Sequence, residues 1–147
     1  MFQKLVAIED TLLSAEALKK LSDYAVQVEL YNERPVDDAE IIRRIGDADA
    51  VLVSFKSPIR KCVLDACPNI RYIGMCCTLY DEKACNVDVV EARRKGITVV
   101  GVKDYGDEGV VEYAISELVR FLHGFGRLSQ KAPANIETYL RSTGELR

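Results

Sequence analysis

Short apolar runs alternate with helix-patterned segments along most of this chain of 147 residues. The segments between the runs carry apolar residues at helical spacing. A repeated strand-then-helix order is typical of parallel strands joined by crossover helices. The order therefore predicts an α/β domain around an open sheet of about five parallel strands. The expected strands are residues 5–8, 26–30, 50–53, 71–75 and 97–100.

The pattern inside two of these runs predicts where they lie in the sheet. Residues 50–53 are continuously apolar, as in a strand that is buried on both faces. Val26, Val28 and Leu30 instead alternate with polar residues, which indicates a wetter face. We therefore expect the first run at the centre of the sheet and the second at an edge.

Capping residues indicate where the helices begin and end. Asp37, followed three residues later by Glu40, resembles a capping box. Asn86 is the expected N-cap of a helix that Gly96 closes. A last helix starts near Asp107 and carries a broad apolar stripe, which has to be covered by another apolar surface. The stripe consists of Val110, Val111, Ala114, Ile115, Leu118, Val119 and Leu122.

The charge balance argues against a nucleic-acid partner. The 20 basic and 23 acidic residues leave a formal charge of −3, and no block of like charge marks a phosphate-binding surface. The apolar run at residues 5–8 is too short for a signal-peptide core, and no stretch approaches the ~20 apolar residues of a membrane span. We therefore expect a cytoplasmic protein without a membrane partner.

The five cysteines suit reduced thiols better than a disulfide framework, because their number is odd and no export signal is seen. No two of them form a CxxC pair. Cys76 and Cys77 are adjacent, and His123, the only histidine, is distant in sequence. Such residues make a poor tetrahedral zinc site, so we expect no metal.

Ligands of an open parallel sheet gather at the carboxyl ends of the strands. This rule selects four loops, at residues 9–10, 54–57, 77–81 and 103–106. One interpretation is a phosphorylation receiver, since Glu9, Asp10 and Lys103 match the acidic residues and the lysine of that fold. A receiver also needs an aspartate after the third strand, where this chain has Ser54. The receiver therefore stays a minor alternative.

A second interpretation comes from motifs that run from Cys67-Pro68 to about Gly124. They include Asn69 to Met75, Asn86-Val87-Asp88, Ala92 to Val99, Tyr105-Gly106 and Val110-Val111-Glu112. In order and spacing this pattern resembles the D-isomer-specific 2-hydroxyacid dehydrogenase family. The resemblance covers roughly residues 4 to 124. It implies a flavodoxin-like three-layer substrate domain followed by a long C-terminal helix.

The resemblance also implies a site for a small 2-hydroxy or 2-keto carboxylate. The backbone amides of Thr78 and Leu79 would bind the substrate carboxylate, because converging N–H donors suit an oxyanion. Ser54, Lys56 and Tyr105 would line the same site, although Lys56 is equally well explained as a solvated surface lysine. No catalytic residue is assigned.

Three departures from the family pattern bear on that site. Cys77 and Leu79 stand where the family has glycines, so the loop is expected to be reshaped. Residues 82–85 are additional, and Tyr113 replaces the histidine of the last motif. His123 matches no catalytic position, and we interpret it as a helix-end residue.

The family uses NAD, and its cofactor domain follows the long helix. No GxGxxG motif occurs in this chain, and residues 127–147 are too short for a βαβ unit. We therefore expect a substrate domain at 1–106, a linking helix at 107–124 and a tail at 125–147. Such a chain, truncated before the cofactor domain, should bind NAD weakly at best and be inactive alone.

A different class of function remains open at this stage. The chain could be a non-catalytic binding or assembly module that keeps the dehydrogenase fold for its surface. The apolar stripe of residues 107–123 would then pack against a second copy, which predicts a homodimer.

Overall fold

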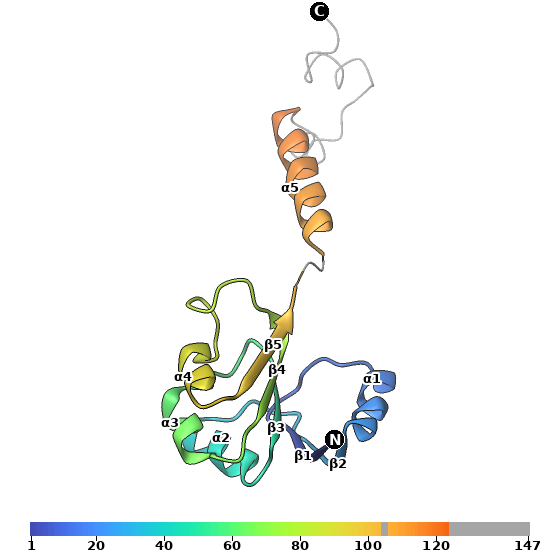
Figure 1. Ribbon diagram of the computed structural model, residues 1–147. Coiled ribbons are helices and arrows are strands. Elements are labelled where there is room, and N and C mark those ends of the chain that lie inside the picture. Colours follow the sequence, from blue (N-terminus) through green and yellow to red (C-terminus); the bar gives the residue numbers. More distant parts are fainter. Residues whose placement is uncertain (104–105, 124–147) are drawn as a thin grey trace, which may run out of the picture. The chain divides into compact units, whose positions relative to one another are not determined.

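The computed structural model describes residues 1–103 and 106–123, and the chain forms two compact units, Met1–Lys103 and Asp104–Arg147. Tyr105 and the tail at 125–147 lie outside the described residues. The first unit holds one parallel sheet with strand order β2-β1-β3-β4-β5, as Figure 1 shows. Its strands are β1 (Phe2–Ala7), β2 (Ala25–Leu30), β3 (Ala50–Val53), β4 (Tyr72–Thr78) and β5 (Thr98–Val102).

Helices cover both faces of this sheet, so the predicted α/β class is confirmed. One face carries α1 with a short 3₁₀ turn, and the other carries α2, α3 and α4 (Figure 1). Their bounds are α1 (Ala15–Lys20), the turn Leu21–Asp23, α2 (Asp38–Ile45), α3 (Lys61–Ala66) and α4 (Val89–Arg94).

Alternation along the strands divides the core into two clusters. On β3, Val51 and Val53 face the larger cluster with Ile41 and Ile45 of α2, whereas Leu52 faces the smaller one. Side chains alternate because successive residues of a strand point to opposite faces. β3 is buried at every position, which confirms its predicted central place.

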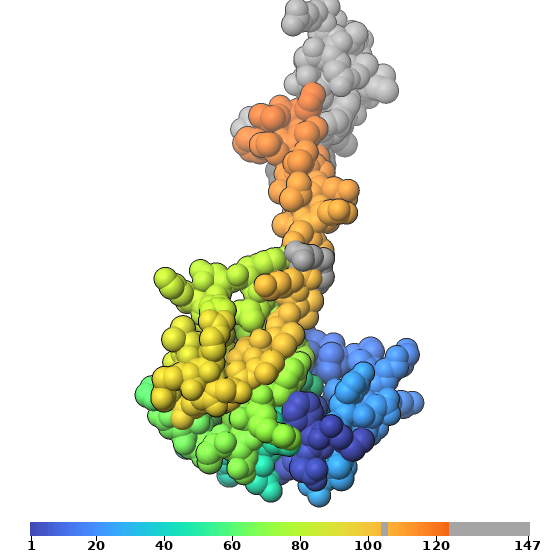
Figure 2. Space-filling view, viewed as in Figure 1, coloured from blue at the N-terminus to red at the C-terminus, as the bar shows by residue number. Residues whose placement is uncertain are grey.

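One edge strand of the sheet was predicted from the sequence, and the other was not. β2 is an edge strand, as its alternating pattern predicted. β5 forms the other edge, and Figure 2 shows it at the surface of the first unit, where Val100 and Val102 are exposed. β4 is longer than predicted, since it runs on through Cys77 to Thr78 after a register shift that follows Met75. The loop expected at residues 77–81 therefore begins only after Thr78.

The N-caps of α2 and α4 test the helix starts that were predicted from the sequence. Asp37 caps α2 by accepting a hydrogen bond from the Glu40 amide at 2.8 Å, but Glu40 reaches back to the amide of Val36 instead of closing the box on Asp37. The predicted cap of α4 was wrong by two residues. Asp88 caps that helix, which frees Asn86 for another role.

The second unit is described through α5 (Asp107–Leu122), the long C-terminal helix that the sequence predicted. It begins after Gly106, whose φ of 72° lies in the left-handed region open to glycine. The apolar residues of its stripe are exposed, among them Val110, Ile115 and Leu118. Within the described part of the chain, no helix combines the length and apolar character needed to cross a bilayer.

Candidate functional site

The strand order places the candidate site at the carboxyl ends of β1 and β3. The chain runs from β1 outward to β2 and then returns to the other side of β1 to form β3. In open α/β sheets this reversal leaves a crevice where ligands bind. Glu9 follows β1 and Ser54 follows β3, so both residues lie at this reversal point.

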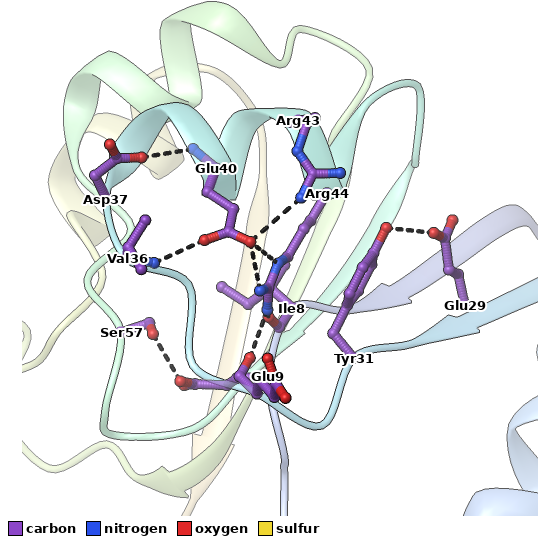
Figure 3. A network of polar contacts seen from close by, with 11 residues as sticks. Ile8, Glu9, Glu29, Tyr31, Val36, Asp37, Glu40, Arg43, Arg44 and Ser57 are labelled. Carbon is purple, nitrogen blue, oxygen red and sulfur yellow. Dashed lines mark hydrogen bonds and ion pairs between the residues drawn. The ribbon is translucent and has the colours of Figure 1, made fainter.

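A buried carboxylate joins the two strand ends. Glu9 is 1% exposed and accepts three hydrogen bonds. Its Oε1 accepts from the Ser54 amide at 3.2 Å and from the Ser54 hydroxyl at 2.7 Å, while its Oε2 accepts from the Ser57 hydroxyl at 2.6 Å. Figure 3 shows Glu9 reaching toward Ser57. The loop at 54–57 is thereby fixed from the inside of the protein.

Asn86 holds the same loop from another direction. Its Nδ2 donates to the carbonyl of Ser54 at 2.7 Å and to that of Ser57 at 2.6 Å. Next to it, the Ile59 amide donates to the Asn86 carbonyl at 2.8 Å, within an isolated parallel bridge between Ile59 and Val87. Both peptide carbonyls are satisfied in this way, which anchors the loop to the segment before α4.

A buried arginine supports the end of β1. Arg44 Nη1 donates to the carbonyls of Ile8 at 2.7 Å and Glu33 at 2.5 Å, and its guanidinium forms an ion pair with Glu40 at 2.6 Å (Figure 3). Its Cζ also lies 4.6 Å from the centroid of the Tyr31 ring. Arg44 therefore fixes the backbone immediately before Glu9.

The structure brings Ser54 and Lys56 into this arrangement in different ways. Ser54 is buried, with its hydroxyl proton committed to Glu9. The Lys56 amide donates to the Ser54 hydroxyl oxygen at 3.2 Å. The Lys56 ammonium makes no ion pair with any described residue, so it is available for an anion.

Thr78 and Leu79 follow on the neighbouring strand. Thr78 ends β4, where it pairs with Val102. The Leu79 amide donates to the Val102 carbonyl at 3.2 Å, so it would have to share or leave that partner to bind a carboxylate. Tyr105, the remaining predicted residue of the site, lies outside the described residues.

The substitutions for family glycines are accommodated without strain. Among the described residues, the only one other than glycine with a positive φ is Leu12, so Cys77 and Leu79 have ordinary backbone angles. Gly101 provides the space, because a Cβ there would lie 2.4 Å from the Leu79 Cβ. The expected reshaping therefore takes the form of a longer strand, β4, with a register shift.

One thiol, that of Cys77, lies beside this site, 4.0 Å from Asn86 Oδ1. Burial raises the pKa of Cys77, and the neighbouring Cys85 and Glu9 raise it further. A protonated thiol is a poor nucleophile and a poor metal ligand. No group of three or more potential ligands among the described residues could hold a metal ion.

Two residues of the site were not anticipated in these roles. Glu9 was noted only as an acidic residue after the first strand, and Asn86 was assigned to a helix cap. Both act over a long sequence separation, since Glu9 bonds to residues 45 and 48 positions away and Asn86 to residues 29 and 32 away. For Glu9, its position in a loop selected by strand order was the one available signal, whereas Asn86 lies outside those loops.

Comparison with known proteins identifies the family of this chain. Residues 6–145 match the family described as D-isomer specific 2-hydroxyacid dehydrogenase, catalytic domain. The chain belongs to this family. The match confirms the resemblance inferred from the motifs, and it favours the dehydrogenase interpretation of the loops over the receiver.

Individual relatives of this dehydrogenase family are longer than this chain. A hydroxypyruvate reductase of Blautia hydrogenotrophica is 40% identical over 94 residues, which are 64% of this chain and 28% of that protein. The solved PH0520 protein of Pyrococcus horikoshii is 27% identical, with a TM-score of 0.69 over 94% of this chain and 41% of its own. An acyclic imino acid reductase solved with NADPH and D-Arg shares the fold at 21% identity, with a TM-score of 0.73 over 90% of this chain and 42% of its own. This chain spans less than half of each.

Proposed function

We propose that this chain is the substrate-binding part of an NAD(P)-dependent D-2-hydroxyacid dehydrogenase, and that it takes a small 2-hydroxy or 2-keto carboxylate. The observation that carries the proposal is the loop at 54–57, which Glu9 and Asn86 fix at the switch point of the sheet. A loop fixed from two sides keeps its amides oriented without a ligand, which lowers the entropic cost of binding.

The proposed chemistry divides between orientation and charge. The substrate carboxylate would contact the Phe55 amide of the loop at 54–57 and the amides of Thr78 and Leu79, with Lys56 adding attraction. Such N–H donors bind an oxyanion without requiring a buried cation. Tyr105 completes the proposed set of substrate-binding residues. The role of this chain is thus to bind and orient the acid.

The dinucleotide does not fit the described residues of the first unit. The turn after β1 carries Glu9 and Asp10, and the first turn of α1 carries Glu16, so negative charge lies where a pyrophosphate would need N–H donors and glycine. We therefore assign no cofactor-binding residue in this chain and expect no tight binding of NAD.

The proposal is tested by titrating the purified chain with hydroxypyruvate and glyoxylate while recording amide chemical shifts. We expect weak binding, with a Kd of about 1 mM, which corresponds to roughly −4 kcal/mol. Shifts should concentrate at residues 54–57 and 78–79. Glycolaldehyde, which lacks the carboxylate, is the control ligand, and Lys56→Gln should weaken binding of the acids alone.

Two results would contradict the proposal. One is the absence of amide shifts in the two loops at ligand concentrations well above the expected Kd of about 1 mM. The other is turnover of a 2-hydroxy or 2-keto acid by this chain with added nicotinamide coenzyme, since that would require a complete redox site within it.

A second candidate function is assembly through α5. Its exposed apolar residues, including Val111, Leu118 and Leu122, motivate a homodimer, because such a stripe is stable in water only when covered. Light scattering at tens of micromolar, a concentration suited to a weak interface, should find a dimer that Leu118→Lys disrupts. A monomer under these conditions would contradict the assembly function and leave substrate binding to be judged separately.

The cellular setting proposed for this protein is the reducing cytoplasm. All five cysteines are free thiols in the structure, and such thiols persist where the compartment keeps them reduced. We propose no nucleic-acid partner, since the net charge is −3 and the sequence has no block of like charge that would mark a phosphate-binding surface.

A further inference from the structure

Glu9 is a buried carboxylate whose hydrogen-bond partners among the described residues are all neutral. Its two oxygens accept from one amide and two hydroxyls, and no ion pair with it occurs among the described residues. Burying an ionised carboxylate is costly unless it is well hydrogen-bonded. A neutral side chain could fill the same space at lower cost, so the carboxylate needs a reason that packing does not give.

The reason lies in the direction of the hydrogen bonds. An ionised carboxylate only accepts, so the hydroxyl protons of Ser54 and Ser57 must both point toward Glu9. The Ser54 oxygen can then accept from the Lys56 amide, as it does at 3.2 Å. A chain of donors therefore runs from Lys56 through Ser54 to Glu9, and every polar atom of Ser54 has a fixed partner.

This arrangement decides what the loop can offer a ligand. The hydroxyls of Ser54 and Ser57 both donate to Glu9, and Asn86 Nδ2 donates to the backbone carbonyls of the same two serines. The amides of Phe55 and Ser57 make no hydrogen bond within the described part of the chain. Because Ser57 is 1% exposed and Phe55 is exposed, the Phe55 amide and the Lys56 ammonium are the groups of the loop that remain for an anion.

We propose that Glu9 is a positioning residue for carboxylate binding, acting through Ser54 and Ser57 without touching the substrate. This inference rests on the proposed function, since it assigns the loop at 54–57 to the substrate carboxylate. Glu9 sets the donor pattern of the loop by fixing both hydroxyl protons inward, while Asn86 holds the carbonyls.

Asp49 offers a matched control, because it is a second buried carboxylate that binds backbone amides in the same unit. It accepts from the amides of Gln3 and Lys4, each at 3.0 Å, and pairs with Arg71 at 2.6 Å. These contacts lie at the amino ends of the strands, opposite the candidate site. Loss of Asp49 should therefore destabilise the fold without altering the loop.

The experiment compares Glu9→Ala, Glu9→Gln and Asp49→Ala in the full chain, at a temperature where each is folded by circular dichroism. Affinity for hydroxypyruvate is measured by amide shift titration. We expect Glu9→Ala to lose at least tenfold and Asp49→Ala to stay within twofold. Glu9→Gln should lose less than Glu9→Ala, because its amide oxygen still accepts from Ser54 while its NH₂ group can only donate toward Ser57.

Hydrogen exchange provides a readout that does not depend on a ligand. In Glu9→Ala the amides of Ser54 and Lys56 should exchange at least tenfold faster, while that of Ile59, which is bonded to the Asn86 carbonyl, should not change beyond any global loss of stability. Uniform acceleration of all three amides would overturn the positioning role, as would equal loss of affinity in Glu9→Ala and Asp49→Ala.

The outcomes also separate this inference from the proposed function. If the wild-type chain binds neither acid, the proposed function fails and the assignment of Glu9 to carboxylate binding falls with it. If the wild type binds but Glu9→Ala binds equally well, the proposed function stands and the positioning role is refuted.

Discussion

Replacing Arg44 with methionine should destabilise the first unit far more than replacing its neighbour Arg43. Arg44 is 6% exposed at its side chain and donates to the carbonyls of Ile8 and Glu33, whereas the Arg43 side chain is 67% exposed. Both arginines contact the same oxygen of Glu40, so the pair of variants compares a buried donor with a surface one.

The expected magnitude follows from the carbonyls that lose their donor. Leaving a buried acceptor unsatisfied costs about 1–3 kcal/mol. The Ile8 carbonyl is buried and that of Glu33 is partly buried, so we expect Arg44→Met to lower the free energy of unfolding by about 3 kcal/mol. The ion pair with Glu40 adds little to this free energy, because that carboxylate is close to water.

The assay is urea unfolding of the first unit, followed by circular dichroism. With a slope of about 2 kcal/mol per molar urea, the midpoint should fall by about 1.5 M in Arg44→Met. Arg43→Met should leave it unchanged within error, because an exposed ion pair contributes little. Equal midpoints for the two variants would refute the argument that the buried carbonyls depend on Arg44.

Three further predictions concern other parts of the first unit. Hydrogen bonds from Arg94 and Lys61 lower the pKa of Glu91 to about 2, below its ordinary value of 4.5. The stabilising effect of the Glu91 carboxylate is therefore complete above about pH 4.5 and is lost as the pH falls toward 2. In Glu91→Gln the pH dependence of the free energy of unfolding should be flatter over this range. Gly101→Ala should cost about 1–3 kcal/mol in urea unfolding, since the new Cβ would lie 2.4 Å from a side-chain atom of the loop after β4; unchanged stability would show that the loop gives way freely. The Asp38 carboxylate, by accepting a hydrogen bond from the thiol, raises the pKa of Cys62, so Asp38→Asn should speed alkylation of that thiol by iodoacetamide at pH 8.

Local sequence patterns determined the order and type of the elements. The continuous run at 50–53 identified a central strand and the alternation at 26–30 an edge, because burial on one face or both leaves its period in the sequence. The motifs around Asn86 to Asp88 and Ala92 to Val99 sufficed for the family, which the match over residues 6–145 confirms.

The ends of the elements were less well determined. Asp88, not Asn86, caps α4, and β4 continues to Thr78. Both errors have one physical origin. Asn86 satisfies two carbonyls of a loop about 30 residues earlier, and β4 extends because Gly101 on the neighbouring strand leaves room for Leu79. Partners of this kind leave no local period in the sequence.

The amino-acid sequence by itself determined the order of strands and helices, the class of fold and the family. Each of these depends on patterns within a few turns or on motif spacing. The tertiary structure alone decided that the carboxylate of Glu9 meets two serine hydroxyls from a loop 45 to 48 residues away. Chain reversal at the switch point creates that meeting, and only the folded backbone determines which donors remain for a ligand.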